Sequence, residues 1–234
     1  MTFGVLLGAV IVVAIAVAVS SSGGSGSAPS PTSAAAKQQA STVNTLLSGI
    51  PQSGVTLGSP TAKVTVTEFG DLECPICAEF AQSSENQLIS NDVRSGKVKL
   101  VYRSLPTATG NGPNPSIFPT QQAAAYAAGA QGKAWNYIEL FYHEQGQENT
   151  GYVTPSYLDG LARQVPGLNY STWLSASQSS TYTSQVSADE QAASSKGFNS
   201  TPTIVIQGPK GQAQPIVGDP SSYSQLETVI KSVS

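Results

Sequence analysis

The sequence predicts an α/β domain that follows an apolar N-terminal segment and a flexible tether. Three observations indicate this fold class. A β-branched, alternating stretch at residues 64–69 is followed by a helical pattern and then by a second strand at 98–102. A long block rich in helix formers occupies residues 121–196. Further strands and a closing amphipathic helix complete the chain, and this mixture of strands and helices is typical of α/β domains.

Residues 3–19 form the apolar segment and carry no charged or strongly polar side chain. Their length is at the lower edge of the roughly 17–25 residues that span a bilayer as a helix. It also exceeds the roughly 7–15 residues of a signal-peptide core. We therefore predict one transmembrane or signal-anchor helix within residues 1–19. A small-x-small stretch, Ala18-Val19-Ser20, keeps cleavage as a signal peptide open as the alternative.

The next segment, residues 20–33, consists mainly of Ser, Gly and Pro. Such a composition buries too little apolar surface to offset the entropy of ordering the chain, so a flexible tether is expected. Residues 34–48 then become helix-prone. We assign residues 20–50 to a linker with a short helix and residues 51–234 to the folded domain.

Within the domain, Gly70 and Asp71 end the first strand shortly before a helix begins. The closing segment places Leu226, Ile230 and Val233 on one helical face. The predicted elements, in chain order, are a strand at 64–69, a helix at 78–93, a strand at 98–102, helices within 121–196, strands at 203–206 and 215–217, and a helix at 222–233.

Composition narrows the class of function. Charged residues make up 11% of the chain, its formal net charge is -3, and no run of Lys or Arg is present, so nucleic acid is not expected as a partner. The 2 cysteines lie in the sequence Cys74-Pro75-Ile76-Cys77. A disulfide across so short a loop stabilises little, because it removes almost no entropy from the unfolded chain. The pair therefore indicates either a redox site or half of a metal site.

The position of the pair favours redox chemistry. Cys74 is expected at the N-cap of the helix, with Pro75 at its first position. There the free backbone N–H groups and the positive helix end favour a thiolate, the species that attacks a disulfide. Cys77, one turn later, is placed to resolve a mixed disulfide formed by Cys74. Zinc requires four ligands and His143 is the only histidine left to join the cysteines, so we expect no metal, and the chemistry needs no other cofactor.

The residues around the cysteines resemble a known family. Glu68–Phe80 resembles the active-site stretch of the DsbA-like branch of the thioredoxin superfamily, and Ser200–Gly208 resembles its threonine–cis-proline loop with the strand that follows. Between them, Leu100–Pro106 and Ala123–Phe141 resemble the strand and inserted helices of the same branch. The resemblance extends from about residue 54 to the C-terminus, and it points to the membrane-anchored bacterial type.

The resemblance implies a thioredoxin fold with a helical subdomain inserted at about residues 115–196. It also implies a cis peptide bond before Pro202, which would pack beside the cysteines and bind the substrate chain together with Thr201. Thr201-Pro202 without this context would indicate an ordinary turn before a strand. In this family Pro75, Ile76 and Thr201 occupy positions that tune the redox potential. Strongly oxidising members carry a histidine between the cysteines, and Ile76 lacks its hydrogen-bond donor.

Glu68 lies on the first predicted strand, six positions before Cys74. In the superfamily an acid at this offset is buried beneath the cysteines and relays the proton of the second one. Burial would raise its pKa and make it a base for Cys77. The alternative is an exposed carboxylate at a strand edge. Glu73 is expected to be solvated, and His143 is given no role.

These features predict an enzyme, a protein thiol–disulfide oxidoreductase that oxidises cysteines of exported proteins through a reversible Cys74–Cys77 disulfide. Reduced or unfolded exported proteins would be its substrates, and a membrane redox partner would reoxidise the pair. The predicted location is the cell membrane, anchored through residues 3–19 with the catalytic domain outside the cytoplasm, or secretion after signal cleavage. The alternatives are a disulfide reductase or isomerase using the same residues, and a non-catalytic binding module with this fold.

Overall fold

The structure of the protein, a computed structural model, describes residue 30, residues 32–220 and residues 222–234. The anchor predicted at residues 3–19 and most of the predicted tether therefore lie outside the described residues. Among the residues that are described, no helix combines the length and apolar character needed to cross a bilayer.

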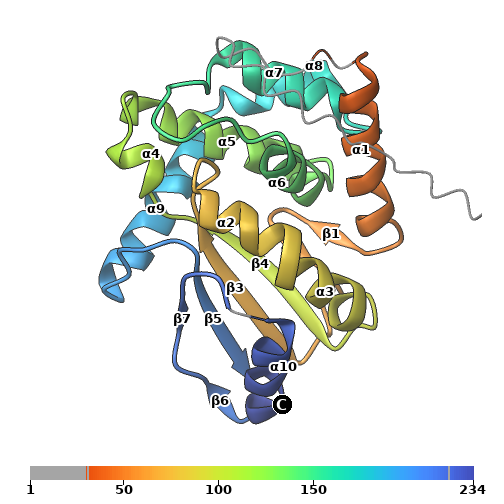
Figure 1. The fold of residues 1–234 in the computed structure, drawn as a ribbon, viewed down its shortest axis with the longest axis vertical. Coiled ribbons are helices and arrows are strands. Elements are labelled where there is room, and N and C mark those ends of the chain that lie inside the picture. The colour runs from red at the N-terminus through yellow and green to blue at the C-terminus, as the bar shows by residue number, and fades with distance from the viewer. Residues whose placement is uncertain (1–29, 31, 221) are drawn as a thin grey trace, which may run out of the picture.

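The described strands form one mixed sheet in the order β1-β2-β4-β3-β5-β6, and β7 also pairs with β5 (Figure 1). Strand β3 is central, parallel to β4 and antiparallel to β5. The parallel pair requires a crossover connection, which the cysteine-bearing helix provides. The bounds of the strands are β1 Gln52–Ser53, β2 Thr56–Leu57, β3 Val64–Gly70, β4 Val98–Ser104, β5 Thr203–Gly208, β6 Gly211–Gln212 and β7 Ile216–Val217.

The crossover helix begins as α2, Pro75–Phe80, and continues without a break to residue 93. It passes through a π-helical turn at Ala81–Glu85, the short α3 at Asn86–Leu88 and a second π-helical turn at Ile89–Val93. It packs on the same face of the sheet as the closing helix α10, Tyr223–Val233 (Figure 1). The helices predicted at 78–93 and 222–233 are therefore both present.

Most of the helices between β4 and β5 gather at one end of the sheet, at the top of Figure 1, while α9 runs down the left side of the view. Alanine-rich α5 is their centre and contacts α6, α7, α8 and α9. Its side chains are small, so neighbouring helices can approach its backbone closely. As a result, α5 is buried on most sides. These helices are α4 Ala108–Asn111, α5 Phe118–Gly129, α6 Ala134–His143, α7 Pro155–Gln164, α8 Tyr170–Ser177 and α9 Ser180–Ser195.

The N-terminal helix α1, Ala34–Leu47, is part of this helical layer. The side chain of Ser33 caps it by accepting a hydrogen bond from the Ala36 backbone N–H at 3.0 Å. Its buried face, which includes Val43 and Leu47, packs against α6. The helix expected at residues 34–48 is therefore present, and it covers the inserted helices.

Both tryptophans fill the core of the insertion and hydrogen-bond to backbone carbonyls. The Trp135 indole donates to the carbonyl of Val55 at 3.0 Å, which ties α6 to the β1–β2 hairpin. The Trp173 indole donates to the carbonyl of Ala124 at 2.8 Å and ties α8 to α5. Each bond satisfies an N–H group that would otherwise be costly to bury.

The short strands are the main departure from the sequence prediction. The β1–β2 hairpin and β6 were not expected, and the strand predicted at 215–217 is reduced to Ile216–Val217. Two-residue strands are too short to show an alternating pattern. Their pairing is decided by neighbours: β2 adds to the edge of β4, and β6 follows the turn after β5.

Gly208, at the end of β5, has no room for a side chain, because an added Cβ would collide with the backbone carbonyl of Val233 at the end of α10. The same carbonyl accepts a hydrogen bond from the Lys210 N–H at 3.0 Å. We expect Gly208→Ala to lower the free energy of unfolding in urea by about 1–3 kcal/mol through overpacking. Gln212→Ala, at an exposed position of the same hairpin, should change it by less than about 0.5 kcal/mol. An equal effect of the two substitutions would contradict this account.

Candidate active site

Cys74 is the N-cap of α2 and has an extended backbone, with φ −76° and ψ 119°, while Pro75 is at the first helical position. In the reduced form described here, its Sγ donates a hydrogen bond to the carbonyl of Thr201 at 3.5 Å. The predicted placement of Cys74 and Pro75 at the helix N-terminus is thus confirmed. Both cysteines are free thiols in this structure, so the predicted Cys74–Cys77 disulfide belongs to the other redox state and stays a prediction.

The environment of Cys74 favours its thiolate. A hydrogen bond from the Cys77 side chain is the largest influence and lowers the pKa of Cys74 to about 6. Burial opposes this shift, while the Thr201 side chain and the backbone N–H groups of Ile76 and Cys77 assist it. At neutral pH, Cys74 is therefore largely ionised and able to act as a nucleophile.

Cys77 has the opposite character. It is fully buried, and burial raises the pKa of its thiol well above the ordinary value. The hydrogen bond that it shares with Cys74 raises that pKa further, as does the charge of Glu68. One helical turn therefore separates a thiolate that attacks from a thiol that holds its proton.

Thr201 and Pro202 lie next to the cysteine pair, as the resemblance implied. The Thr201–Pro202 peptide bond is cis, and the Pro202 carbonyl accepts a hydrogen bond from the Gly218 N–H at 2.8 Å. The hydroxyl groups of Thr201 and Thr107 are hydrogen-bonded to each other. The loop before β5 is thus held between β7 and the start of the inserted helices. Its role in binding substrate remains a prediction.

Glu68 lies on β3 with 1% of its surface exposed, which excludes the alternative of an exposed strand edge. Burial raises its pKa to about 8, and the charge of Cys74 adds to the shift. The hydroxyl of Tyr142 donates to Glu68 Oε1 at 3.4 Å and opposes the shift. The predicted burial and the predicted direction of the pKa shift are both present, while the role of Glu68 as a base stays a prediction.

Glu73 was expected to be solvated, and this was wrong. Only 6% of its surface is exposed, and burial together with the charge of Asp71 raises its pKa to about 7. Glu73 lies in the loop before α2, where its side chain is hydrogen-bonded to Thr109 and its backbone N–H donates to Asp71. Gln145 reinforces this loop by donating to the carbonyls of Leu72 and Cys74 at 2.8 Å and 3.1 Å.

Sequence reasoning missed Asp71, which organises this loop. One of its carboxylate oxygens accepts from the backbone N–H groups of Thr107 and Thr109, both at 2.9 Å. The other accepts from the Glu73 N–H at 3.0 Å and from the Thr109 hydroxyl at 2.5 Å. Asp71 therefore joins the cysteine loop to α4. An aspartate just after a strand was the available signal, but it had been interpreted only as a strand break.

Beside the cysteines is an open groove of about 480 Å³, lined by Cys74, Ile76, Thr201, Asn111 and Glu148 among others. Ile76 projects into it with 40% of its surface exposed.

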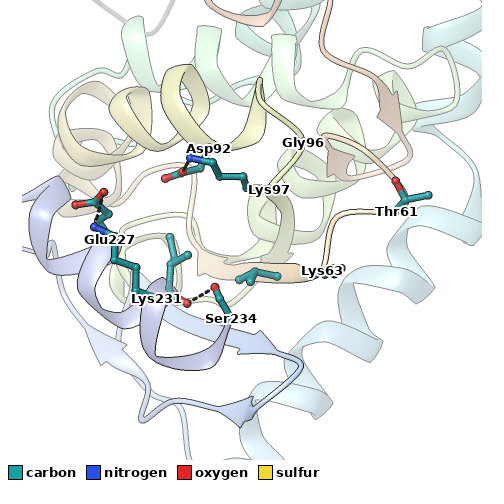
Figure 2. Close-up of a pocket in the computed structure, with 10 residues that line it drawn as sticks. Thr61, Lys63, Asp92, Gly96, Lys97, Glu227, Lys231 and Ser234 are labelled. Atoms are coloured by element: carbon teal, nitrogen blue, oxygen red, sulfur yellow. Dashed lines mark hydrogen bonds and ion pairs between the residues drawn. The ribbon is translucent and has the colours of Figure 1, made fainter.

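A second cavity, of about 520 Å³, lies between α10 and the turn at residues 92–97 and is lined by Lys63, Lys97 and Lys231 (Figure 2). It includes Val64 at the start of β3, whereas Cys74 follows the end of that strand. The second cavity is therefore remote from the redox pair.

The described part of the chain holds no group of three or more His, Cys, Asp and Glu residues arranged to bind a metal ion.

A family model described as thioredoxin matches residues 51–232. The chain belongs to the thioredoxin family.

Its relatives include proteins named for disulfide bond formation. Disulfide bond formation protein D of Bacillus subtilis is 25% identical over 150 residues, which are 64% of this chain and 66% of that protein. The crystal structure of oxidised BdbD from Bacillus subtilis has a TM-score of 0.65 at 24% identity, covering 80% of this chain and 96% of that one. Pseudomonas aeruginosa DsbA2 has a TM-score of 0.62 at 24% identity, covering 80% and 97%. The structural matches confirm the predicted thioredoxin fold with inserted helices, and the relatives agree with the predicted enzyme class.

The shifted pKa of Cys74 is directly testable. In the reduced thioredoxin-family protein, the rate of alkylation of Cys74 by iodoacetamide should rise with pH around a midpoint near 6. Cys77→Ala removes the largest stabilising hydrogen bond, so the midpoint should move upward, toward the ordinary value of 9.0. Cys77→Ser retains a donor and should stay closer to the wild-type midpoint. A wild-type midpoint near 9 would contradict this description of the site.

Proposed function

We propose that this protein is an extracytoplasmic thiol–disulfide oxidoreductase that introduces disulfide bonds into exported proteins. The observation that carries the proposal is the division of roles within one helical turn. Cys74 borders an open groove and has a pKa of about 6, whereas Cys77 is buried with its pKa raised. Such a pair exchanges a disulfide with a partner at one sulfur and retains a proton at the other.

The reaction begins when a client thiolate attacks Sγ of Cys74 in the oxidised pair. The Cys74–Cys77 bond breaks, its electrons leave on Cys77, and Cys77 takes a proton from the buried carboxyl of Glu68. A second client thiolate then attacks the client sulfur in the mixed disulfide. Cys74 departs as a thiolate, which its low pKa favours. Two electrons have moved from the client to the pair, and the client holds a disulfide.

The groove supports binding of an extended client segment beside the attacked sulfur. Thr201 lines it just before β5, and Ile76 offers an apolar contact at its edge. Pro75, Ile76 and Thr201 would also tune the potential of the pair, because each adjoins Cys74. The side chain of Ile76 adds no hydrogen-bond donor to the backbone N–H that this residue already offers the thiolate. Reduction or isomerisation by the same residues is therefore the competing function.

Completing the cycle requires that a membrane redox partner remove the two electrons from Cys74 and Cys77. We propose that residues 3–19 anchor the protein in the cell membrane, with the domain on the extracytoplasmic side near that partner. The names of the relatives, which concern disulfide bond formation, support an extracytoplasmic location because structural disulfides form outside the cytoplasm.

The deciding measurement is a redox titration of the full chain against glutathione, together with refolding of a reduced, disulfide-containing protein. A potential near the oxidising extreme of about −120 mV supports the proposal, and one near about −270 mV supports a reductase. Cys74→Ser should abolish catalysed refolding, while Cys77→Ser should trap the client as a mixed disulfide. Unchanged refolding by Cys74→Ser would mean that the protein is a binding module.

The substitution Ile76→His tests the tuning role of the position between the cysteines. A histidine donor facing the thiolate should lower the pKa of Cys74 by about one unit and make the pair more oxidising by about 30 mV, the equivalent of tenfold in the equilibrium constant. Ile76→Leu preserves the apolar surface and is expected to leave both quantities unchanged. The alkylation midpoint and the glutathione titration measure them separately.

A further inference from the structure

Three glutamates that come from separate elements are buried together beneath the cysteine pair. Glu68 is on β3, Glu85 ends the π-helical turn that continues α2, and Glu139 is in the middle of α6. Glu85 and Glu139 are 0% exposed, and Glu68 is 1% exposed. Each acts electrostatically on at least one of the others, which places the three within one buried cluster.

The described surroundings leave these carboxyl groups almost without partners. Both oxygens of Glu85, both oxygens of Glu139 and Oε2 of Glu68 are buried and have no hydrogen-bond partner in the rest of the described chain. The groups that act on the three carboxyls are one another, Cys74 and the hydroxyl of Tyr142. An ionised carboxylate in such a place is costly, whereas a protonated carboxyl can donate to the neighbouring acid.

The fold keeps space open for this arrangement. A Cβ added at Gly70 would lie 2.8 Å from Glu68 Oε1, 2.8 Å from the ring of Tyr102 and 3.0 Å from the Tyr142 hydroxyl. Gly70 therefore leaves the gap that the Glu68 carboxyl occupies. The π-helical turn adds a residue to the helical repeat and thereby changes the direction of Glu85, and such turns are frequent at functional sites. Gln82 fixes that turn to α6 by donating to the carbonyl of Tyr142 at 3.0 Å.

We propose that Glu85 and Glu139 are positioning residues that share protons with Glu68, so that the cluster accepts and returns the proton of Cys77. This inference rests on the proposed redox function and extends it beyond Glu68. When Cys77 attacks Cys74 in a mixed disulfide, its proton passes to the Glu68 carboxylate, and the leaving thiolate takes a proton from solvent. In the reverse step Glu68 returns the proton to Cys77 as the disulfide bond breaks.

Sharing gives the cluster a property that one buried carboxylate lacks. A single ionised Glu68 would be left uncompensated in the core, but protonated Glu85 and Glu139 can donate to it. Besides Cys74, the titratable groups that surround the cluster are Cys77 on α2, Tyr102 on β4 and Tyr142 on α6, and the pKa of each of these three is raised. All three keep their protons at neutral pH, so the carboxyls are the groups free to exchange one.

The test uses the full chain with glutathione bound to Cys74 as a mixed disulfide and with Cys77 as a free thiol, and it follows resolution by Cys77 as a function of pH. In the wild type the rate should rise around a midpoint below 8, because the pKa of about 8 for Glu68 includes the charge of the Cys74 thiolate, which the mixed disulfide removes. Glu85→Gln and Glu139→Gln remove an ionisable neighbour and supply an amide donor, so each should lower the midpoint by about one unit. Glu85→Asp retains the titratable group and should restore a midpoint closer to that of the wild type.

Glu144→Gln is the matched control. Glu144 caps the end of α6, and burial raises its pKa to about 7, but it bonds to Gln164 and does not act on the cluster. Its substitution should leave the resolution midpoint unchanged. None of these variants should move the alkylation midpoint of Cys74 as far as Glu85→Gln and Glu139→Gln move the resolution midpoint. Unchanged resolution midpoints in both Glu85→Gln and Glu139→Gln would overturn the proposal.

Infrared difference spectra of the reduced minus the oxidised protein provide a second measurement. Formation of the Cys74 thiolate raises the pKa of Glu68, so reduction near pH 8 should increase the carbonyl band of protonated carboxyl groups. The increase should disappear in Glu68→Gln and shift in Glu85→Gln and Glu139→Gln; a band unaffected by the latter two would also overturn the proposal. Neither measurement uses a client protein. Failure of the cluster therefore leaves the oxidase function standing, and failure of the oxidase function leaves these results intact.

Discussion

The antiparallel pairing of β3 with β5 brings together two segments that are far apart in the chain, and the rest of the site is arranged around it. The register pairs Glu68 with Ile204 and Phe69 with Thr203. One strand therefore ends where the cysteine loop begins, and the other begins where Pro202 ends its loop. The carbonyl of Thr201 meets the sulfur of Cys74 as a result. The inserted helices occupy the chain between these strands, and they return Tyr142 and Glu139 to the underside of the same site.

The pairing also creates the difference between the two cysteines. Cys74 ends up at the edge of a groove, at the N-terminus of a helix whose backbone N–H groups stabilise negative charge. Cys77, one turn further, is enclosed by the sheet and the inserted helices, where water cannot stabilise a thiolate. The same helix thus places the Cys74 sulfur where backbone N–H groups stabilise its negative charge, and it places the Cys77 sulfur in surroundings of low polarity. Disulfide exchange at one sulfur with proton retention at the other follows from that single difference in position.

Much of this arrangement could be predicted from sequence, and the part that could not has a physical explanation. The strand at 64–69, the cysteine helix and the helical block show strong local patterns, and Cys74 at the N-cap follows from Pro75. The resemblance of Ser200–Gly208 to the loop of a known family predicted the cis peptide bond. The local pattern Thr201-Pro202 alone would have predicted an ordinary turn. Glu73, Glu85 and Glu139 were misplaced or missed because a carboxylate in a sequence carries no sign of burial. Only the three-dimensional approach of β3, the π-helical turn and α6 removes these carboxyls from water.

The buried acids bear on the direction of electron flow, which the cysteine pair alone leaves open. Reduction places a negative charge on Cys74, and ionised carboxylates nearby would oppose that charge and make the pair more reducing. Glu68 and Glu139, with pKa values of about 8, stay mostly protonated at neutral pH and impose little of that repulsion. Above pH 8 the same groups ionise and the repulsion appears, so the oxidising character of the pair is greatest on the acidic side of that value. The proposed cluster would therefore serve the proposed oxidase in two ways. It would exchange the proton of Cys77, and it would spare the Cys74 thiolate the repulsion of a nearby carboxylate, although the Ile76 side chain offers that thiolate no hydrogen bond.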